Sequence, residues 1–265
     1  MFYKHNHTVR SDILDISGIS HGFATRAGGV SVIPEVASMN LAPLMGDPAE
    51  NAEKNVSLLA AYAGLDGCPV IYGSQIHSAT VHTVTPDDTA VSPDFRKCDG
   101  YVTDFPEIAL LVRAADCVPI LLCGKKADNS PVIGAVHAGW RGTVCKIAAV
   151  AVEKMLELGA EINTVRAAVG PSIHDCCFEV KEDFISSVTE MAGEDFARRH
   201  IYLRDGKYFA SLQDMNIEIL ENAGVSREMI DVSPDCTAHM NGIYHSHRAT
   251  NGKRGVGGGI IGIIK

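Results

Sequence analysis

The chain has little of what marks several large classes of protein. It contains one tryptophan, and no apolar stretch approaches the 18 or more residues that span a bilayer. Residues 1–12 lack the apolar segment of a secretory signal. Positive charge is scarce, because 23 Lys and Arg face 32 Asp and Glu, for a formal net charge of -9. The sequence therefore argues against nucleic-acid and membrane partners and predicts a cytoplasmic protein.

Cysteine is also sparse, and its spacing is uninformative. Eight cysteines in 265 residues are too few for a disulfide scaffold, and no Cys-x-x-Cys pair occurs. We expect buried thiols for the most part. The adjacent Cys176 and Cys177 are interpreted as ordinary thiols in a turn, because neighbours in sequence do not easily bind one metal together.

What is present is a globular composition, with 46% hydrophobic and 21% charged residues. Short segments rich in Val, Ile and Leu, bounded by Gly, Pro or Asp, predict many strands. Strands are expected at 19–25, 70–73, 80–84, 100–102, 109–112, 118–122, 132–137, 163–170 and 256–264. Helices are expected at 48–63, 142–158, 182–191 and 211–223, with Asp47 and Ser211 as N-caps.

These elements do not alternate strictly, which predicts an α+β fold with mixed sheets covered by helices. No repeat, low-complexity tract or long charge run divides the chain. We therefore expect a single domain over residues 1–265. The glycines between Gly255 and Gly262 precede no helix and are not interpreted as a phosphate-binding loop.

His77, Cys117 and His137 each lie near the end of a predicted strand, and their side chains are soft or titratable. Imidazole and thiolate suit zinc, and a catalytic zinc typically has three protein ligands and one open position. The same residues also fit a Cys117 thiolate nucleophile with His137 as its base. Spacing alone leaves both interpretations open, together with a purely structural role.

Three arginines lie beside small or polar turn residues. Arg26 precedes Gly28, Arg141 lies in the loop His-Ala-Gly-Trp-Arg-Gly, and Arg248 follows a Ser-His pair. A guanidinium binds phosphate or carboxylate through two parallel hydrogen bonds and stays charged. Each is a candidate anion ligand.

The order of several longer motifs resembles one known family. The motifs are HGFATRAGGVS, SMNLA, SQIHSATVH, DGYVTD, RAADCVPILL, HAGWRGTV, GPSIHDCCFEV and YHSHR. Members of that family are known as laccase-domain proteins or multicopper polyphenol oxidases, as purine nucleoside phosphorylases and as peptidoglycan editing factors. The resemblance runs from Ile19 to the last strand. It implies a single α+β domain related to cysteine-hydrolase-like toxins, with zinc on His77, Cys117 and His137.

The resemblance also implies an activity. It is the phosphorolysis of adenosine, inosine and methylthioadenosine, with adenosine deamination as a further reaction, so the partners are small molecules including phosphate. Cys117, His137 and Arg248 are then expected to be catalytic. The substrate-binding residues are expected to be Arg26, Asn40, Gln75, Arg141 and His247.

Other activities stay open at this point. One is an amidase that removes a wrongly incorporated amino acid from a UDP-muramyl peptidoglycan precursor, using Cys117 and His137. Another is polyphenol oxidation with copper in the same site, since divalent copper outcompetes zinc on affinity. A true multicopper site is not expected, because the 11 histidines include only two His-x-His pairs, His5/His7 and His245/His247. A binding protein without catalysis is the third class, and the sequence does not indicate an oligomeric state.

Overall fold

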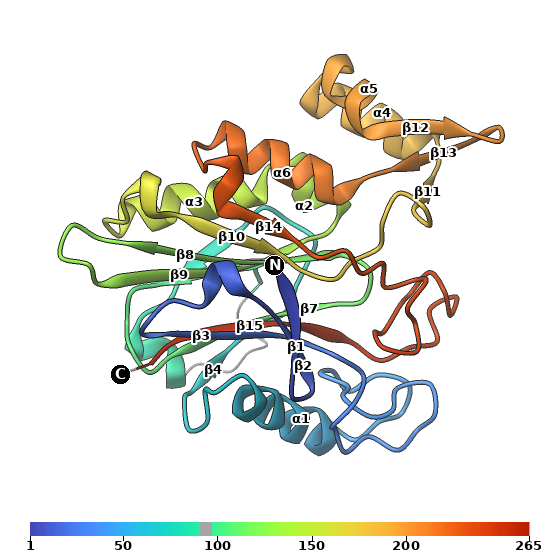
Figure 1. Cartoon of the computed structure of the whole chain (residues 1–265). Helices are drawn as coiled ribbons and strands as arrows, with labels where there is room; N and C mark the ends of the chain where they lie inside the picture. Colours follow the sequence, from blue (N-terminus) through green and yellow to red (C-terminus); the bar gives the residue numbers. More distant parts are fainter. Residues whose placement is uncertain (91–96, 265) are drawn as a thin grey trace.

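Two six-stranded mixed β-sheets stack face to face, and helices cover the outer face of each (Figure 1). The structure is a computed structural model in which residues 1–90 and 97–264 are described. In the first sheet every neighbouring pair is antiparallel except β4 with β7. Its order is β1 (Phe2–His5), β2 (Thr8–Ser11), β3 (Ile19–Ala24), β15 (Gly257–Ile263), β7 (Ala109–Ala114) and β4 (Val70–Ile71).

The second sheet has antiparallel pairs in its centre and a parallel pair at each edge. Its order is β14 (Ile230–Val232), β10 (Arg166–Val169), β8 (Val118–Lys125), β9 (Pro131–Ala138), β6 (Gly100–Thr103) and β5 (Val81–Thr83). The chain crosses from the first sheet to the second between β7 and β8. Residues 115–117 therefore link a strand of the first sheet to a strand of the second.

Helices complete a four-layer arrangement. The first sheet is covered by α1 (Ala49–Tyr62), and the second by α2 (Trp140–Val144), α3 (Ile147–Glu157) and α6 (Leu212–Asn222). A small antiparallel sheet projects at the upper right of Figure 1 with two further helices. It contains β11 (Glu179–Val180), β13 (Lys207–Ala210) and β12 (Ile201–Arg204), and its helices are α4 (Glu182–Ala192) and α5 (Glu194–His200).

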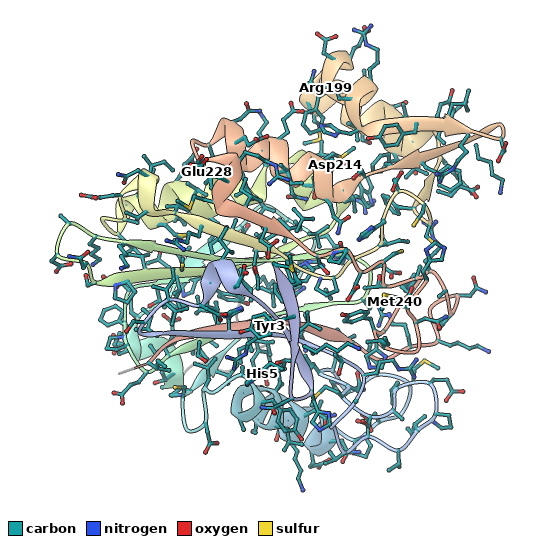
Figure 2. All side chains as sticks on the ribbon, in the orientation of Figure 1. Tyr3, His5, Arg199, Asp214, Glu228 and Met240 are labelled. Carbon is teal, nitrogen blue, oxygen red and sulfur yellow. The ribbon has the colours of Figure 1, made fainter. Side chains whose placement is uncertain are left out.

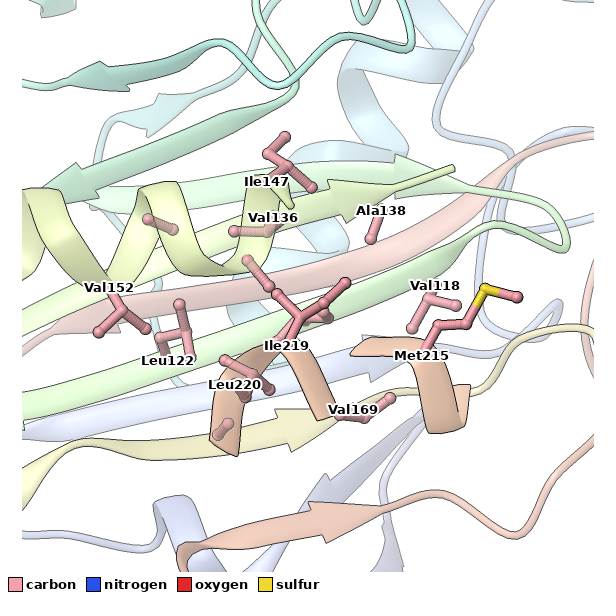
Figure 3. Packing of buried hydrophobic residues seen from close by; sticks show 14 of the residues in the cluster. Val118, Leu122, Val136, Ala138, Ile147, Val152, Val169, Met215, Ile219 and Leu220 are labelled. Atoms are coloured by element: carbon pink, nitrogen blue, oxygen red, sulfur yellow. The ribbon is translucent and has the colours of Figure 1, made fainter. Parts of the chain in front are cut away.

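Strand β8 shows why the sheets stack. Its side chains alternate, so that Ile120 and Leu122 pack toward the helices while Leu121 and Cys123 pack toward the first sheet. Both faces are buried, which explains its uninterrupted apolar run. Figure 3 shows the helix-facing cluster, where Leu220 of α6 joins the side chains of the sheet.

The structure confirms the α+β fold class and most of the expected elements. Two local predictions were wrong. Asp47 does not cap α1, because its carboxylate accepts hydrogen bonds from the side chains of Ser31, Asn40 and Asn51 instead. The helix expected over 142–158 is broken at Lys146, whose φ is 59°. The Ser211 cap is confirmed by a hydrogen bond from the Asp214 backbone N–H.

All three sheets contain strands that the sequence analysis did not predict. They are β1, β2, β11, β12, β13 and β14, which are short. Helix α5 was not predicted either. Within the described part of the chain, no helix is long and apolar enough to cross a membrane.

The glycines near the C-terminus serve close packing in β15. A Cβ atom at Gly259 would lie 2.9 Å from the Phe23 ring, and one at Gly262 would lie 2.5 Å from Leu65. A Cβ at Gly258 would lie 2.1 Å from the backbone oxygen of Val112 on β7. Backbone atoms of a paired strand cannot give way as a flexible side chain does.

We therefore expect Gly258→Ala to push β15 away from β7 and to lower the free energy of unfolding by about 1–3 kcal/mol, the usual effect of overpacking. Gly242→Ala is the matched control, because nothing lies within 4 Å of a Cβ at that exposed turn. Urea unfolding of both variants measures the difference. Equal stability of the two variants would contradict the packing argument.

Candidate active site

Sheet register brings Cys117 and His137 together. Cys117 directly precedes β8, and Pro119 of β8 pairs with His137 near the end of β9. Because β8 and β9 are antiparallel, the start of one strand adjoins the end of the other. The two side chains thus meet at the edge where the chain crosses between the sheets.

The buried carboxylate of Asp99 brings His77 to the same place. It accepts hydrogen bonds from the backbone N–H groups of Ile76, His77 and Ser78 at 3.2, 3.0 and 2.7 Å, and from the Ser78 hydroxyl at 2.8 Å. His77 has a φ of 58° in this turn. Asp99 immediately precedes β6, so the loop that carries His77 is fastened to the second sheet.

The same carboxylate orients His137. Asp99 Oδ1 lies 2.9 Å from His137 Nδ1, and the Asp99 carbonyl accepts a hydrogen bond from the His137 backbone N–H at 2.7 Å. Asp99 is fully buried and His137 is 3% exposed. The Nε2 atom of His137 is left to bind a ligand, which is the arrangement that supports metal-binding histidines in many proteins.

Three pKa values are displaced together. Burial raises the pKa of the Cys117 thiol, but hydrogen bonds and charge from His137 and His77 outweigh it and lower that pKa to about 6. Burial lowers the pKa of His137, yet Asp99 and Cys117 raise it to about 9. Burial raises the pKa of Asp99, while His137 and Ser78 bring it down to about 2. The electrostatics favour a thiolate beside a charged imidazole.

The donor set fits a borderline-soft metal ion. One ligand atom each from His77, Cys117 and His137 lies within 4.8 Å of the others. Gly139 leaves room beside them, because a Cβ there would lie 2.9 Å from His77 Cδ2 and 3.3 Å from Cys117 Sγ. Two imidazoles and one thiolate with space next to them match a catalytic zinc site with an open position.

A cavity of about 320 Å³ lies beside the triad, and His77 and Cys117 are part of its wall. Its lining residues are His77, Ala115, Asp116, Cys117, Ile173, Phe178, His247, Arg248 and Arg254. Arg254 Nε is buried and has no hydrogen-bond partner among the described residues. Burial lowers the pKa of this guanidinium and nearby Asp116 opposes that shift, but an arginine stays protonated. A half-buried guanidinium in a cavity, with one buried N–H that has no acceptor among the described residues, favours an anionic ligand.

The Asp116 carboxylate connects the Cys117 loop to the segments that carry Thr237 and Arg248. The backbone of this residue has a φ of 90°. Its Oδ2 accepts a hydrogen bond from the Arg248 backbone N–H at 2.6 Å, and its Oδ1 accepts one from the Thr237 hydroxyl at 2.7 Å. The residue next to Cys117 therefore holds the segment that carries Arg248.

Two of the expected substrate-binding or anion-binding residues lie on this cavity, His247 and Arg248. The Arg248 guanidinium also donates to the carbonyl groups of Cys177 and Glu179 at 2.9 and 3.1 Å. Arg141 is not in the lining, and its guanidinium lies 4.2 Å from the centre of the Trp140 ring.

Three further expected residues bind backbone groups elsewhere. The Arg26 guanidinium donates to the carbonyl groups of Ala37, Asn241 and Pro34. Asn40 is fully buried and donates to the Ala42 carbonyl at 2.6 Å. Gln75 exchanges two hydrogen bonds with the backbone of Arg113, both at 2.7 Å. Their substrate-binding roles stay predictions, and the structure gives them no place in the cavity lining.

Sequence reasoning missed Asp99 and Arg254. Asp99 stands at the start of a predicted strand, but its contact with His137 depends on β6 pairing with β9, which the sequence did not indicate. Arg254 lies among glycines just before the last strand, a pattern with no separate signal for a ligand. Both become visible only when the strand order is known.

Comparison with known proteins identifies the family of this chain. The sequence profile of the family described as multi-copper polyphenol oxidoreductase laccase matches residues 20–264. A Deinococcus radiodurans protein named purine nucleoside phosphorylase is 36% identical over 92% of this chain and 89% of its own length. A protein from an unknown prokaryotic organism, named adenosine deaminase RL5, is 32% identical over 85% of this chain and 87% of its own length.

Solved structures agree as well. Bacillus licheniformis YfiH, described as a hypothetical protein, is 27% identical and superposes with a TM-score of 0.88 over 99% of this chain and 98% of its own. Geobacillus stearothermophilus YlmD is also 27% identical, with a TM-score of 0.85 over 100% and 99%. The chain therefore belongs to the multi-copper polyphenol oxidoreductase laccase family, whose description implies metal binding and whose named relatives include enzymes of purine nucleosides.

Proposed function

We propose that this chain is a zinc-dependent purine nucleoside phosphorylase, with His77, Cys117 and His137 as the metal ligands. The observation that carries the proposal is the triad itself, oriented by the buried Asp99 beside a cavity. The cavity also contains the half-buried Arg254, whose buried Nε has no hydrogen-bond partner among the described residues. The Deinococcus relative named purine nucleoside phosphorylase supports the reaction class. We propose a single domain over residues 1–265, since loops that adjoin strands of both sheets line the cavity.

The charges in the cavity suit the reaction. A zinc ion held by the triad supplies a Lewis acid. Arg254 and Arg248 bind the phosphate oxygens, and the Arg254 Nε donor gains the acceptor that it lacks. Cleavage of the glycosidic bond develops positive charge on the sugar, which a phosphate held beside it stabilises. Ile173 and Phe178 offer the apolar surface for a base.

The finer parts of the proposal follow the sequence predictions. Adenosine, inosine and methylthioadenosine are the proposed substrates. Adenosine deamination is proposed as a second reaction, which the name of the RL5 relative supports. Copper is the competing metal, because the same soft donors accept it. The cytoplasmic location stays a prediction.

One observation favours a second candidate function. Asp99, His137 and Cys117 follow one another in the order of an orienting carboxylate, a base and a nucleophile. With a Cys117 thiolate as nucleophile, the same cavity suits an amidase acting on a peptidoglycan precursor. The two functions differ in whether turnover needs a metal.

Two substitutions test the metal site: one removes a ligand side chain, and the other adds a side chain next to the triad. We expect Cys117→Ala to lose the metal there and at least about 100-fold in phosphorolysis, because two protein ligands are too few for a catalytic zinc. Gly139→Ala should weaken metal binding, because the added Cβ would crowd His77 and Cys117. The φ of Gly139 is -67°, which alanine also adopts, so backbone strain would not account for the effect. Cys145→Ala is the control, because that thiol is exposed at the end of α2. Zinc bound at this site in Cys117→Ala would sink the ligand assignment.

Alkylation separates the metal site from a thiol nucleophile. In metal-free protein the Cys117 thiolate should react with iodoacetamide with a midpoint near pH 6, because hydrogen bonds from His137 outweigh burial. Asp99→Asn removes the carboxylate that stabilises the imidazolium, so the midpoint should rise. Bound zinc should slow the reaction, and a chelator should inhibit turnover. Activity that survives complete metal removal but not alkylation would favour the amidase.

Arginine-to-lysine substitutions test the anion site, because lysine keeps the positive charge but lacks the paired N–H donors of a guanidinium. Arg254→Lys and Arg248→Lys should each raise the KM for phosphate about 10- to 100-fold, the range expected for lost charge-assisted hydrogen bonds. Lys253→Gln is the matched control, since it removes an exposed positive charge next to Arg254. Initial rates with inosine at varied phosphate concentration give the values. A wild-type KM in both arginine variants would move the phosphate site away from this cavity.

A further inference from the structure

A second cluster of soft ligands lies on two loops behind the cavity wall. One ligand atom each from Cys176, Cys177, Cys236 and His239 lies within 4.8 Å of the others. Cys176 and Cys177 follow β10 in the chain. Cys236 and His239 follow β14, which is the parallel neighbour of β10. Figure 2 shows Met240, the next residue after His239, on the loop at the right of the molecule. None of these four ligands belongs to the triad.

The backbone holds the two loops in register. Ser172 and Cys236 form a parallel bridge, and the Thr237 N–H donates to the Ser172 carbonyl at 2.9 Å. The His174 N–H donates to Cys236 Sγ at 3.5 Å. A backbone N–H directed at a cysteine sulfur stabilises the thiolate that a metal requires. The cluster is therefore built by hydrogen bonds and not only by the nearness of flexible side chains.

Two of the distances between the ligand atoms match a tetrahedral ion. Zinc lies about 2.3 Å from sulfur and about 2.0–2.1 Å from imidazole nitrogen, so tetrahedral edges are about 3.8 Å between sulfurs and about 3.5 Å between sulfur and nitrogen. Cys176 Sγ lies 3.9 Å from Cys177 Sγ and 3.4 Å from His239 Nδ1. Both distances agree with those edges.

This geometry changes the interpretation of the adjacent cysteines. The N–H groups of Cys177 and Phe178 both donate to the His174 carbonyl, at 3.0 and 2.8 Å. The resulting turn places the two sulfurs of Cys176 and Cys177 on one side. Neighbours in sequence can thus contribute two ligands to one ion here.

We propose that Cys176, Cys177, Cys236 and His239 bind a structural zinc ion, separate from the triad. Three thiolates and one imidazole form a closed Cys₃His set, which is typical of structural zinc, whereas the triad has the three ligands of a catalytic site. The cluster also adjoins the cavity wall. Phe178 lines the cavity, and the Cys177 carbonyl accepts a hydrogen bond from the Arg248 guanidinium at 2.9 Å. The ion would fasten the loop that holds Arg248.

The test removes the triad's metal first. Protein purified without added metal is analysed for zinc in a Cys117→Ala background, where one equivalent per chain should remain. Adding Cys236→Ser should abolish that equivalent, and adding the exposed His239→Ala should weaken zinc binding about 10-fold or more. Cobalt in the Cys117→Ala protein should give intense thiolate-to-metal absorption in a tetrahedral spectrum. Cys68→Ser in place of Cys236→Ser is the control, because that half-buried thiol lies outside both clusters.

Two further readouts keep the outcome clear if Cys236→Ser fails to fold. Zinc should protect Cys176 and Cys177 from iodoacetamide in the otherwise unaltered protein, and the chelated protein should have a lower Tm. A zinc-free Cys117→Ala protein with freely reactive Cys176 and Cys177 would overturn the proposal. Peptide mass analysis that finds a disulfide among these cysteines in freshly purified protein would overturn it as well.

Discussion

The buried carboxylate of Asp99 is the constraint on which the site depends. It receives three backbone N–H groups and a hydroxyl from the His77 loop, and it binds the ring of His137. An isolated buried charge costs several kcal/mol, so this carboxylate is tolerable only because its acceptor positions are filled. The same hydrogen bonds that satisfy Asp99 therefore place two of the three triad ligands.

The stacked sheets supply the third ligand. Because β7 and β8 belong to different sheets, the chain between them passes along the edge of the stack, and Cys117 lies there beside the end of β9. The glycines of β15 let the first sheet pack closely, and Arg254 arrives just before that strand. Packing and chemistry thus depend on one region, where the pairing of β8 with β9 places Cys117 next to His137.

Local patterns predicted much of this fold, whereas the proposed metal triad depended on the family resemblance as well. Uninterrupted apolar segments identified β8 and β9, and His77, Cys117 and His137 could be chosen by donor type and by family resemblance. Asp99 and Arg254 could not be assigned, because their roles arise from strand pairing between distant segments. Asp47 does not act as the expected cap, because Ser31 and Asn40 from the preceding loop and Asn51 from α1 itself donate side-chain hydrogen bonds to its carboxylate.

The metal triad is the central claim, and anomalous diffraction at the zinc edge tests it most directly. Crystals grown from active protein purified without added metal should show a peak about 2.3 Å from Cys117 Sγ and about 2.0–2.1 Å from a ring nitrogen of His77 and of His137. The account predicts that peak in preparations that phosphorolyse inosine. No peak at the triad in a fully active preparation, at the zinc or the copper edge, would contradict it.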